Sequence, residues 1–577
     1  MVRLMSAAVL ALAVSPGLVS AEPFPEHRRP QPQPEQRHAA SSTTTEESFA
    51  PSIDRARENA IHVFNAVHSA MRQWGSSLHH NGLGLIPATI PRGTTLYHGS
   101  RSNSTPAGPE WLAFEVEHSE GFARSFRGGR GSPPPRSPGK GPPPGERPPP
   151  VVVVARDGGQ VPMAAEDDGR DKAVRGYFHT YRANRDLRLL YIDGMAAGKT
   201  DMGTLDTQDF LLRGLQTAPG FGEYERARDL CDIVTPWGLD GVIRMEIGFE
   251  AIYCDFFSGL DFLGALRRPW SDQIEGERGG SDMFEWTRAV GQRYDGIGGG
   301  RVRLDWGSVV SGFWYPLDVR NPEREDMPRL GTVTASQRDV ILGRVTEVLE
   351  KGPEGRVDWQ GVVDMIVTRH ADRIEAMADE EGDEEGFVSQ ALVVTNTFVD
   401  YPRDASDARV LEDELSRAAR ERCVAHFLTP AAVWQDAFTP EDELVYAAVE
   451  EVTTRICGAI FAVRSLLLSA APKLASPAGF SSAGILDILS EQDDDKMGDA
   501  VKAGRQVYQK LKKDLNWSLW KKCKPGCGVA EVCFVAMWPF GLKEDHYSPS
   551  CRNRTAMTGR RAGPGDGERY WNLNRRN

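Results

Sequence analysis

The chain has 577 residues, of which 40% are hydrophobic, so it is long enough to bury a large core and to form two or more domains. Its formal net charge of −13 excludes a nucleic acid or an anionic membrane surface as the main partner, because both would repel it. No segment after the N-terminus approaches the roughly 18 uninterrupted apolar residues of a membrane span, so we expect no membrane anchor.

Residues 1–21 have the features of a cleaved secretory signal peptide. Arg3 supplies the positive charge, Ala7 to Val14 form a short apolar run, and Val19-Ser-Ala21 is a small-residue cleavage site. The alternative, a buried N-terminal helix, explains the apolar run but not the cleavage site. Residues 22–50 are rich in Pro and Gln and then in Ser and Thr, which predicts a disordered leader. We therefore expect a secreted, extracellular protein.

The eight cysteines fit an oxidising compartment, where an even number favours disulfide bonds. The candidates are Cys231, Cys254, Cys423, Cys457, Cys523, Cys527, Cys533 and Cys551. Roughly a hundred pairings are possible, so the connectivity stays open. The last four could also close a zinc site, but in a secreted chain we expect two disulfides there and no metal. Asn103, Asn516 and Asn553 begin glycosylation sequons and are candidate glycosylation sites.

Residues 51–325 predict an α+β domain, interrupted by an exposed Pro-, Gly- and Arg-rich insertion at residues 127–150. Apolar spacing predicts a helix over Ser52 to Trp74, followed by a turn-rich segment, Ile86 to Thr94. The other expected elements are strands at Thr95–Ser100, Trp111–Phe114, Tyr177–Asp193 (two strands or one bent strand), Gly238–Phe257 (with a bend at Gly248) and Trp306–Val319, and helices at about 117–125, Thr207–Leu215 and Tyr224–Val234.

Residues 335–520 predict an all-α domain, because the apolar residues there recur at helical spacing. The expected helices are Ser336–Leu349, Trp359–Met377, Phe387–Val399, Asp407–Phe427, Glu441–Ser469 and the basic amphipathic helix Asp494–Leu519. Residues 521–577 form a small cysteine-rich tail that disulfides would hold together.

The segment Asp193-Gly-Met-Ala-Ala-Gly-Lys-Thr200 follows a strand and ends as a phosphate-binding loop does. However, Asp193 stands where that motif requires glycine, and its carboxylate would repel phosphate. We interpret the segment as a tight turn between a strand and a helix.

Three other segments point to a different chemistry. Tyr97-His98-Gly99 ends a strand, the aromatic strand that ends at Phe114 leads into a helix with Ser119, and a later strand carries Glu250. In type and order these segments resemble the ADP-ribosyltransferase superfamily, in the branch whose signature is His, Tyr, Glu.

The resemblance implies a mixed-sheet fold, NAD as the cofactor or substrate, and roles for named residues. His98 and Gly99 would hold the ribose and amide of nicotinamide, and Tyr97, Phe114 and Ser119 would complete the binding site. Glu250 would steer the reacting ribose, with His98 as the second catalytic residue. A fixed carboxylate suits this reaction, because breaking the nicotinamide–ribose bond builds positive charge on the sugar. The chain would then be a transferase or a glycohydrolase, and the acceptor is unknown.

Two other classes of function stay open. The chain could be a non-enzymatic secreted binding or structural protein, and this alternative predicts that His98 and Glu250 do not share a cleft. The clustered carboxylates Glu115, Glu117 and Glu120 would suit a carbohydrate-active enzyme, although a solvated face explains them equally well.

A metal site formed by histidines lacks support in the sequence. His79, His80 and His118 do not have the spacing of a helical zinc motif, so we interpret them as surface residues.

Overall fold

A computed structural model describes residues 49–125, 174–200, 202–215, 222–270, 283–291, 293–322, 324, 326–401, 412–491, 494–557 and 569–571. The expected signal peptide, nearly all of the leader and the insertion at 127–150 lie outside the described residues. Phe49 begins one compact unit that extends to the C-terminus. The boundaries that we predict within this unit, at about 325–335 and 521, stay predictions.

The helix predicted over Ser52 to Trp74 is three helices, so the prediction of one continuous helix is wrong. They are α1 (Ile53–Glu58), α2 (Ala60–Ser69) and α3 (Gln73–Leu78). The Asn59 side chain ends α1 by donating to the main-chain oxygen of Arg55 (3.2 Å). Met71, between α2 and α3, has a φ of 55°, which an α-helix cannot contain. Apolar periodicity continues across both breaks because all three helices bury apolar side chains.

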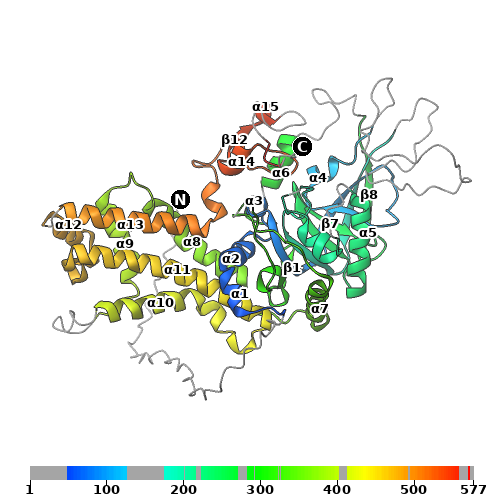
Figure 1. Cartoon of the computed structure of the whole chain (residues 1–577). Helices are drawn as coiled ribbons and strands as arrows, with labels where there is room; N and C mark the ends of the chain where they lie inside the picture. The colour runs from blue at the N-terminus through cyan, green and yellow to red at the C-terminus, as the bar shows by residue number, and fades with distance from the viewer. Residues whose placement is uncertain are drawn as a thin grey trace, which may run out of the picture. The chain divides into compact units, whose positions relative to one another are not determined.

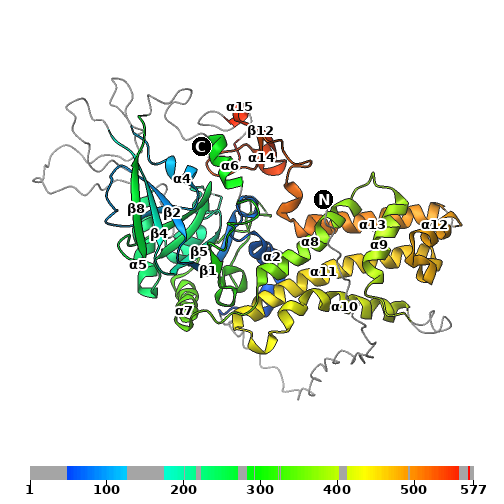
Figure 2. The ribbon, with the colours of Figure 1, turned by 180° about the vertical axis from the view of Figure 1, so that it is seen from behind.

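One mixed sheet organises the first half of the chain (Figures 1 and 2). Its strands run in the order β10-β1-β5-β6-β7-β3-β2-β4-β8, with β9 also paired to β1. β5 and β6 are parallel, and the other neighbours in the described sheet are antiparallel. The strands are β1 (Asn81–Ile90), β2 (Thr95–Ser100), β3 (Glu110–Ala113), β4 (Tyr177–Ala183), β5 (Leu187–Gly194), β6 (Gly241–Glu246), β7 (Gly248–Tyr253), β8 (Leu260–Arg267), β9 (Arg303–Leu304) and β10 (Val310–Ser311). The predicted α+β class with a mixed sheet is confirmed.

Two strands differ from the sequence prediction. The segment predicted as turn-rich belongs largely to β1, where Pro87 pairs with Leu190 and its carbonyl accepts from the Asp305 N–H (2.9 Å). β8 was not predicted at all. The expected strand at Trp306–Val319 contains only the two residues of β10, flanked by short 3₁₀ turns.

The helices beside the sheet are α4 (Val116–Glu120), α5 (Glu223–Val234) and α6 (Met283–Gly291). The helix predicted at Thr207–Leu215 is a π-helical turn, Thr207–Leu212. A disulfide joins Cys231 on α5 to Cys254, the residue that follows β7 (Cα–Cα 5.6 Å). This bond ties α5 to the end of β7.

The second half is helical, as predicted. Its helices are α7 (Ala335–Lys351), α8 (Trp359–Met377), α9 (Glu384–Asn396), α10 (Glu412–Ala432), α11 (Pro440–Ala470), α12 (Ser482–Ser490) and α13 (Asp494–Leu515). Thr334, Asp358, Asp383 and Thr439 cap four of them with their side chains, which explains why these helices begin where they do. The Cys423–Cys457 disulfide joins α10 to α11.

Among the described helices, α11 alone is long and apolar enough to cross a membrane by length and composition. It contacts α13, α10 and α9, and also α2 from the first half of the chain. Its buried side chains include Asp442 and Arg464, which make hydrogen bonds to other helices. We therefore interpret α11 as the central helix of this region.

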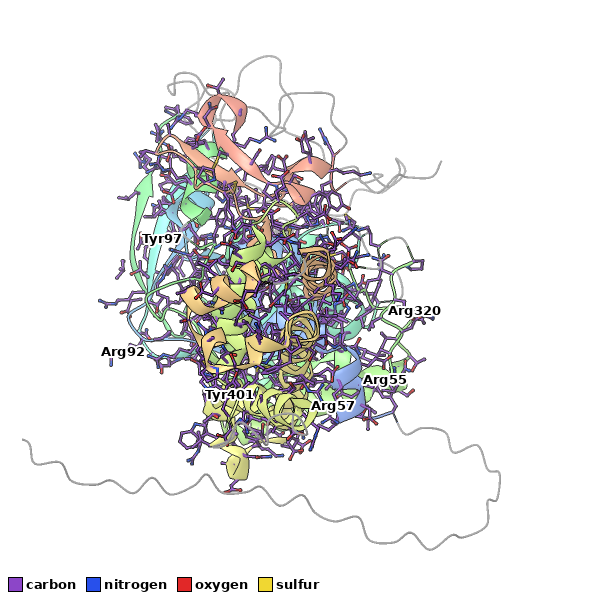
Figure 3. The ribbon with its side chains drawn as sticks, turned by 90° about the vertical axis from the view of Figure 1, so that its left-hand side faces the viewer. Arg55, Arg57, Arg92, Tyr97, Arg320 and Tyr401 are labelled. Atoms are coloured by element: carbon purple, nitrogen blue, oxygen red, sulfur yellow. A yellow bond between two sulfur atoms is a disulfide. The ribbon has the colours of Figure 1, made fainter. Side chains whose placement is uncertain are left out.

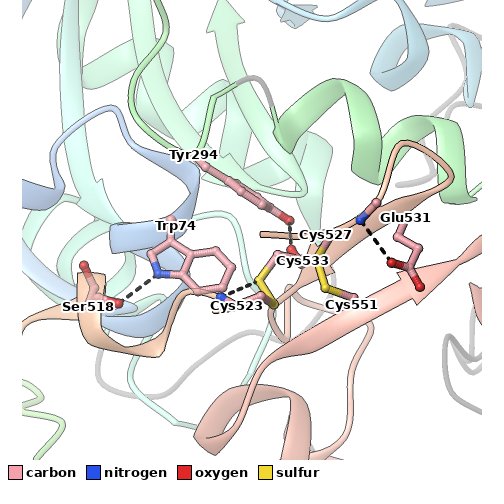
Figure 4. The surroundings of a disulfide bond; sticks show 9 residues. Trp74, Tyr294, Ser518, Cys523, Cys527, Glu531, Cys533 and Cys551 are labelled. Carbon is pink, nitrogen blue, oxygen red and sulfur yellow. Dashed lines mark hydrogen bonds between the residues drawn. A yellow bond between two sulfur atoms is a disulfide. The ribbon is translucent and has the colours of Figure 1, made fainter. Parts of the chain in front are cut away.

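The tail contains β11 (Glu531–Phe534), α14 (Lys543–Tyr547), β12 (Ser550–Asn553) and α15 (Arg554–Met557). Its four cysteines form the Cys523–Cys533 and Cys527–Cys551 disulfides (Figure 4), as predicted. The Tyr294 hydroxyl donates to the Cys533 carbonyl (2.7 Å), so the tail is anchored to the first half of the chain.

The three sequons differ in exposure. Asn103 and Asn553 are exposed, whereas Asn516 is half-buried and is followed two residues later by the buried Ser518.

Candidate functional site

A cavity of about 180 Å³ opens over β2, β3, β6 and β7. Four of the residues that the sequence singled out line it, namely His98, Gly99, Ser119 and Glu250. The strand order explains this convergence, because β3 alone separates the strand of His98 from the strand of Glu250. Both residues line this cavity, but Tyr97, not His98, pairs with Ala113 and through it with Glu250, so the side chains of His98 and Glu250 point to opposite faces of the sheet. The enzyme hypothesis therefore stays a prediction.

His98 is a neutral hydrogen-bonding group at the β2 side of this cavity. Its Nδ1 donates to the main-chain oxygen of Trp111 on β3 (2.8 Å), which leaves Nε2 as the acceptor. Burial, together with the neighbouring His179, lowers the pKa of His98 to about 3. The ring packs near Phe256, with centroids 5.7 Å apart. His98 therefore stays uncharged at physiological pH and is held in one orientation.

Gly99 lets α4 lie directly on β2. A Cβ at this position would lie 2.2 Å from the Ser119 main-chain oxygen and 2.8 Å from the Ala123 nitrogen. No side chain fits there, so glycine is needed for the packing of α4 as well as for any close approach of a ligand.

Glu250 lies at the opposite side, on β7, directly across the hairpin from Arg244 on β6. The Arg244 Nε donates to Glu250 Oε1 (2.8 Å), and His118 Nε2 lies 3.7 Å from Oε2. Burial raises the pKa of Glu250, while the Arg244 guanidinium opposes this shift and favours the carboxylate.

Three further charged residues line the cavity without having been predicted. They are Lys199, Glu223 on α5, and Glu246 at the end of β6. The Lys199 Nζ lies 2.9 Å from Glu246 Oε2 and 3.4 Å from Glu223 Oε2. Arg244 also pairs with Glu223. Burial alone would raise the pKa of Glu223, but Arg244, Lys199 and Arg226 together lower it to about 2.

This buried charge cluster pairs carboxylates with cations. The carboxylates of Glu223, Glu246 and Glu250 lie beside the cations Lys199, Arg244 and Arg226, because Arg226 also pairs with Glu223.

Lys199 reaches the cluster from the loop that we had compared with a phosphate-binding loop. The Ala197 N–H donates to the Met245 carbonyl (2.9 Å), which attaches the loop to β6. The Asp193 carboxylate accepts a hydrogen bond from the Gly84 N–H (2.7 Å). The loop is a tight turn, as interpreted, but its function in the fold is to deliver a lysine to the cavity.

The cysteine-rich tail supports the same wall of the cavity. The Trp538 ring covers Lys199, with Nζ 4.8 Å from the ring centroid. The Gln73 side chain donates to the Glu246 carbonyl (2.9 Å) and to the Met537 sulfur (3.1 Å), and it accepts from the Gly248 N–H (3.0 Å). Helix α3 and the tail therefore hold the β6–β7 turn together.

Two predicted ligand-binding residues, Tyr97 and Phe114, are not among the described residues that line the cavity. Tyr97, labelled in Figure 3, pairs with Ala113 on β3, and Ala113 pairs with Glu250, so Tyr97 lies on the Glu250 face of the sheet. Its ring stacks on Phe178, with centroids 5.5 Å apart. Phe114 is buried in the core, 1% exposed. The aromatic rings that do line the cavity belong to Trp111, Phe122 and Tyr224.

The interpretation of the histidines as surface residues is wrong for His80 and His118, because both are buried. His80 accepts or donates a hydrogen bond with the Tyr570 hydroxyl (2.7 Å), close to the chain's C-terminal end. Glu115 is also buried, 3.0 Å from the Arg293 Nε, rather than part of a solvated face.

His118, Glu246 and Glu250 offer ligand atoms within 4.8 Å of one another, a spacing that a metal ion could bridge. Lys199 and Arg244 already neutralise these two carboxylates, so we assign no metal to them.

Comparison with known proteins places the cavity within a recognised region. Residues 44–275 match the protein-family model described as the YPL277C N-terminal domain. The matched region contains all the strands and helices that line the cavity.

Two curated relatives come from Saccharomyces cerevisiae. The chain is 27% identical over 554 residues to "Uncharacterized protein YOR389W", covering 84% of this chain and 83% of the relative. It is 28% identical over 405 residues to "Uncharacterized protein YPL277C", covering 59% and 80%. No solved structure matches the chain.

Proposed function

We propose that the protein cleaves NAD between nicotinamide and ribose, as a secreted enzyme similar to ADP-ribosyltransferases. The observation that carries this proposal is that His98, Gly99, Ser119 and Glu250, which lie far apart in the chain, line one cavity. These are four of the residues to which the family resemblance gives roles.

The cavity suits the reacting end of a dinucleotide in size and charge. Its volume, about 180 Å³, is below the roughly 300–1,000 Å³ of pockets that enclose a drug-sized ligand, so the rest of the dinucleotide would lie outside. The nicotinamide ring of NAD carries a positive charge, which the carboxylates of Glu246 and Glu250 in the cavity lining would attract. Of the lining rings, Phe122 is 37% exposed and can stack on nicotinamide at the opening.

Glu250 would provide the electrostatic part of catalysis. As the bond from ribose C1′ to nicotinamide breaks, its electron pair goes to the ring nitrogen and positive charge develops on the sugar. A buried carboxylate stabilises that charge more strongly than an exposed one, because little water screens it. The hydrogen bond from Arg244 fixes the carboxylate in place, and the Arg244 charge partly opposes burial, which raises the pKa of Glu250 to about 7.

Secretion is part of the proposal and rests on the N-terminal 21 residues and the disulfides. The four disulfides fit an oxidising compartment. Mass spectrometry of the protein from culture medium tests this: we expect a chain that begins near Glu22 and a mass that falls after deglycosylation.

The enzymatic test uses the purified full chain and a fluorescent etheno analogue of NAD. We expect release of nicotinamide by the wild type and its loss in Glu250→Gln. Asp261→Asn is the matched control, because Asp261 pairs with Arg182 on the same sheet but is exposed and outside the cavity. Equal turnover by Glu250→Gln and Asp261→Asn would overturn the proposal. A folded wild type without turnover would instead favour the alternative, a non-enzymatic secreted binding or structural protein.

A further inference from the structure

We propose that His118 is a second catalytic residue, which accepts the proton of the water that attacks ribose, so that the enzyme is an NAD glycohydrolase. This inference rests on the proposed function and names its acceptor, which is water. The family resemblance gave His118 no role, and the sequence alone suggested a surface histidine.

The position of His118 is fixed by its neighbours. It lies on α4, is 2% exposed, and its ring lines the cavity between Phe122 and Trp286, with centroids 6.0 and 5.3 Å away. The Trp286 indole donates to the Ile247 carbonyl (3.2 Å), which anchors that ring to the β6–β7 turn. The imidazole is therefore held in place before any ligand binds.

The distance from His118 to Glu250 leaves room for a shared water. At 3.7 Å, Nε2 and Oε2 are too far apart for a direct hydrogen bond. A water about 2.8 Å from each atom would complete a triangle at the edge of the cavity, with normal hydrogen bonds to both. The Glu250 carboxylate would then face both the ribose and the water that attacks the ribose.

The groups around the ring keep it uncharged. Glu250 faces it from β7, Glu246 from β6 and Lys199 from the loop after β5. On the other side, a Cβ built on Gly248 would lie 2.8 Å from His118 Nδ1 and 3.2 Å from a Glu115 oxygen, so the β6–β7 turn covers Nδ1. Burial lowers the pKa of His118 to about 4, against the charge of Glu246 and together with that of Lys199. A neutral imidazole can accept a proton.

The reaction balances without a further reagent. The C1′–N bond breaks and its electron pair makes nicotinamide neutral. The water oxygen bonds to C1′, and the water proton moves to His118 Nε2 and then to solvent through the cavity. The products are ADP-ribose, nicotinamide and one proton.

Burial favours water over a protein acceptor. Both His118 and Glu250 are at most 4% exposed, so an acceptor side chain would need to enter a cavity of about 180 Å³ that already holds the reacting end of NAD. A water molecule needs far less space.

The test compares His118→Ala and His118→Gln with the wild type in the full chain, over a range of pH. We expect kcat for hydrolysis to fall on the order of 10²–10⁴-fold, with KM little changed. The wild-type rate should fall in two steps as the pH decreases, near 7 as Glu250 is protonated and near 4 as His118 is protonated. The second step, the acid limb, should be absent in His118→Gln. Added imidazole should restore part of the rate to His118→Ala. His370→Leu is the matched control, since His370 is also buried but lies on α8, and its rate should equal that of the wild type.

Other outcomes would contradict either the proposed function or the role of His118. A wild type that does not cleave NAD overturns the proposed function and this inference with it. If the wild type is active and the His118 variants keep both the rate and the acid limb, the inference alone is overturned. The inference is also overturned if the variants lose rate, have a lower melting temperature and are not rescued by imidazole. Loss of hydrolysis in EDTA with recovery in Mn²⁺ would show that the cluster holds a cation, and would also overturn the role of His118 as the base.

Discussion

Both halves of the molecule bury charged side chains, but they use them differently. In the helical half, Asp442 accepts hydrogen bonds from the Trp359 indole (2.8 Å) and the Thr439 N–H (3.0 Å), and so caps α11. Arg464 donates hydrogen bonds to the neutral side chains of Asn396 and Tyr401. In the sheet half, five charged side chains instead converge on one cavity. Burial of charge alone therefore does not distinguish the two halves, whereas the convergence of buried charges on one cavity does.

The largest expected effect is a difference between two buried carboxylates, Glu250 in the sheet half and Asp442 in the helical half. Glu250→Gln should lower NAD turnover on the order of 10²–10³-fold without lowering the melting temperature, because it removes the charge that stabilises the transition state. Asp442→Asn should lower the melting temperature and leave turnover per folded molecule unchanged. Turnover and thermal unfolding of both variants check this contrast. A loss of turnover in Asp442→Asn at a temperature where it is folded would contradict it.

The two buried arginines should differ in stability. Arg244→Met removes the cationic partner of the buried Glu250 and one of the three partners of Glu223, and should cost about 3–5 kcal/mol of unfolding free energy. Arg464→Met removes hydrogen bonds to neutral groups and should cost about 1–3 kcal/mol. Urea unfolding of each variant gives both values. Equal losses would mean that the charge cluster stabilises the fold no more than the helical contacts do.

Two of the disulfides should stabilise the fold by similar free energies. Serine variants of the Cys231–Cys254 pair and of the Cys423–Cys457 pair should each lose about 2–4 kcal/mol, because the loops they close are of similar length, 23 and 34 residues. Only the first pair ties the helix of Glu223 to the strand of Glu250. We therefore expect slower NAD turnover after loss of Cys231–Cys254 alone, measured where both variants are folded.

The smallest effect concerns His370, whose ring nitrogens have no hydrogen-bond partner among the described residues. His370→Leu should stabilise the protein by about 1 kcal/mol at neutral pH, because it removes an unsatisfied buried polar group.

Burial lowers the pKa of folded His370 to about 3, below the ordinary 6.5 of the unfolded chain. Wild-type stability is therefore lost as the pH falls below about 6.5, since only the unfolded state binds this proton there. The advantage of His370→Leu should grow between pH 6.5 and 5. Urea unfolding at these two pH values measures it, and a constant difference would contradict the assignment.

Local patterns predicted most of the helical half. The helix predicted at Trp359–Met377 is α8 without a change at either end, because Asp358 is a strong N-cap and the apolar stripe is continuous. The predicted strands around Gly248 are β6 and β7, since Gly248, with a φ of 90°, makes the hairpin turn between them. Where the prediction failed, as at Met71, a single backbone angle interrupts an unbroken apolar pattern.

The candidate site could be predicted only in part. His98, Gly99 and Glu250 stand in motifs with a recognisable order. Lys199 belongs to a loop whose sequence suggested phosphate binding, and only the parallel pairing of β5 and β6 brings it to Glu246. Phe114 was misplaced because one residue of offset reverses the face of a strand, and short motifs do not fix that register.

The contact between the tail and Lys199 limits how the protein can be divided for study. A fragment cut at residue 275, where the family match ends, would retain every residue that lines the cavity but would lack Met537 and Trp538. Lys199 would lose its contact with the Trp538 ring, and the β6–β7 turn would lose the hydrogen bond from Trp286 as well as its support from the tail. Activity measured on that fragment would reflect a cavity wall with fewer contacts, so recombinant work should begin with the whole chain.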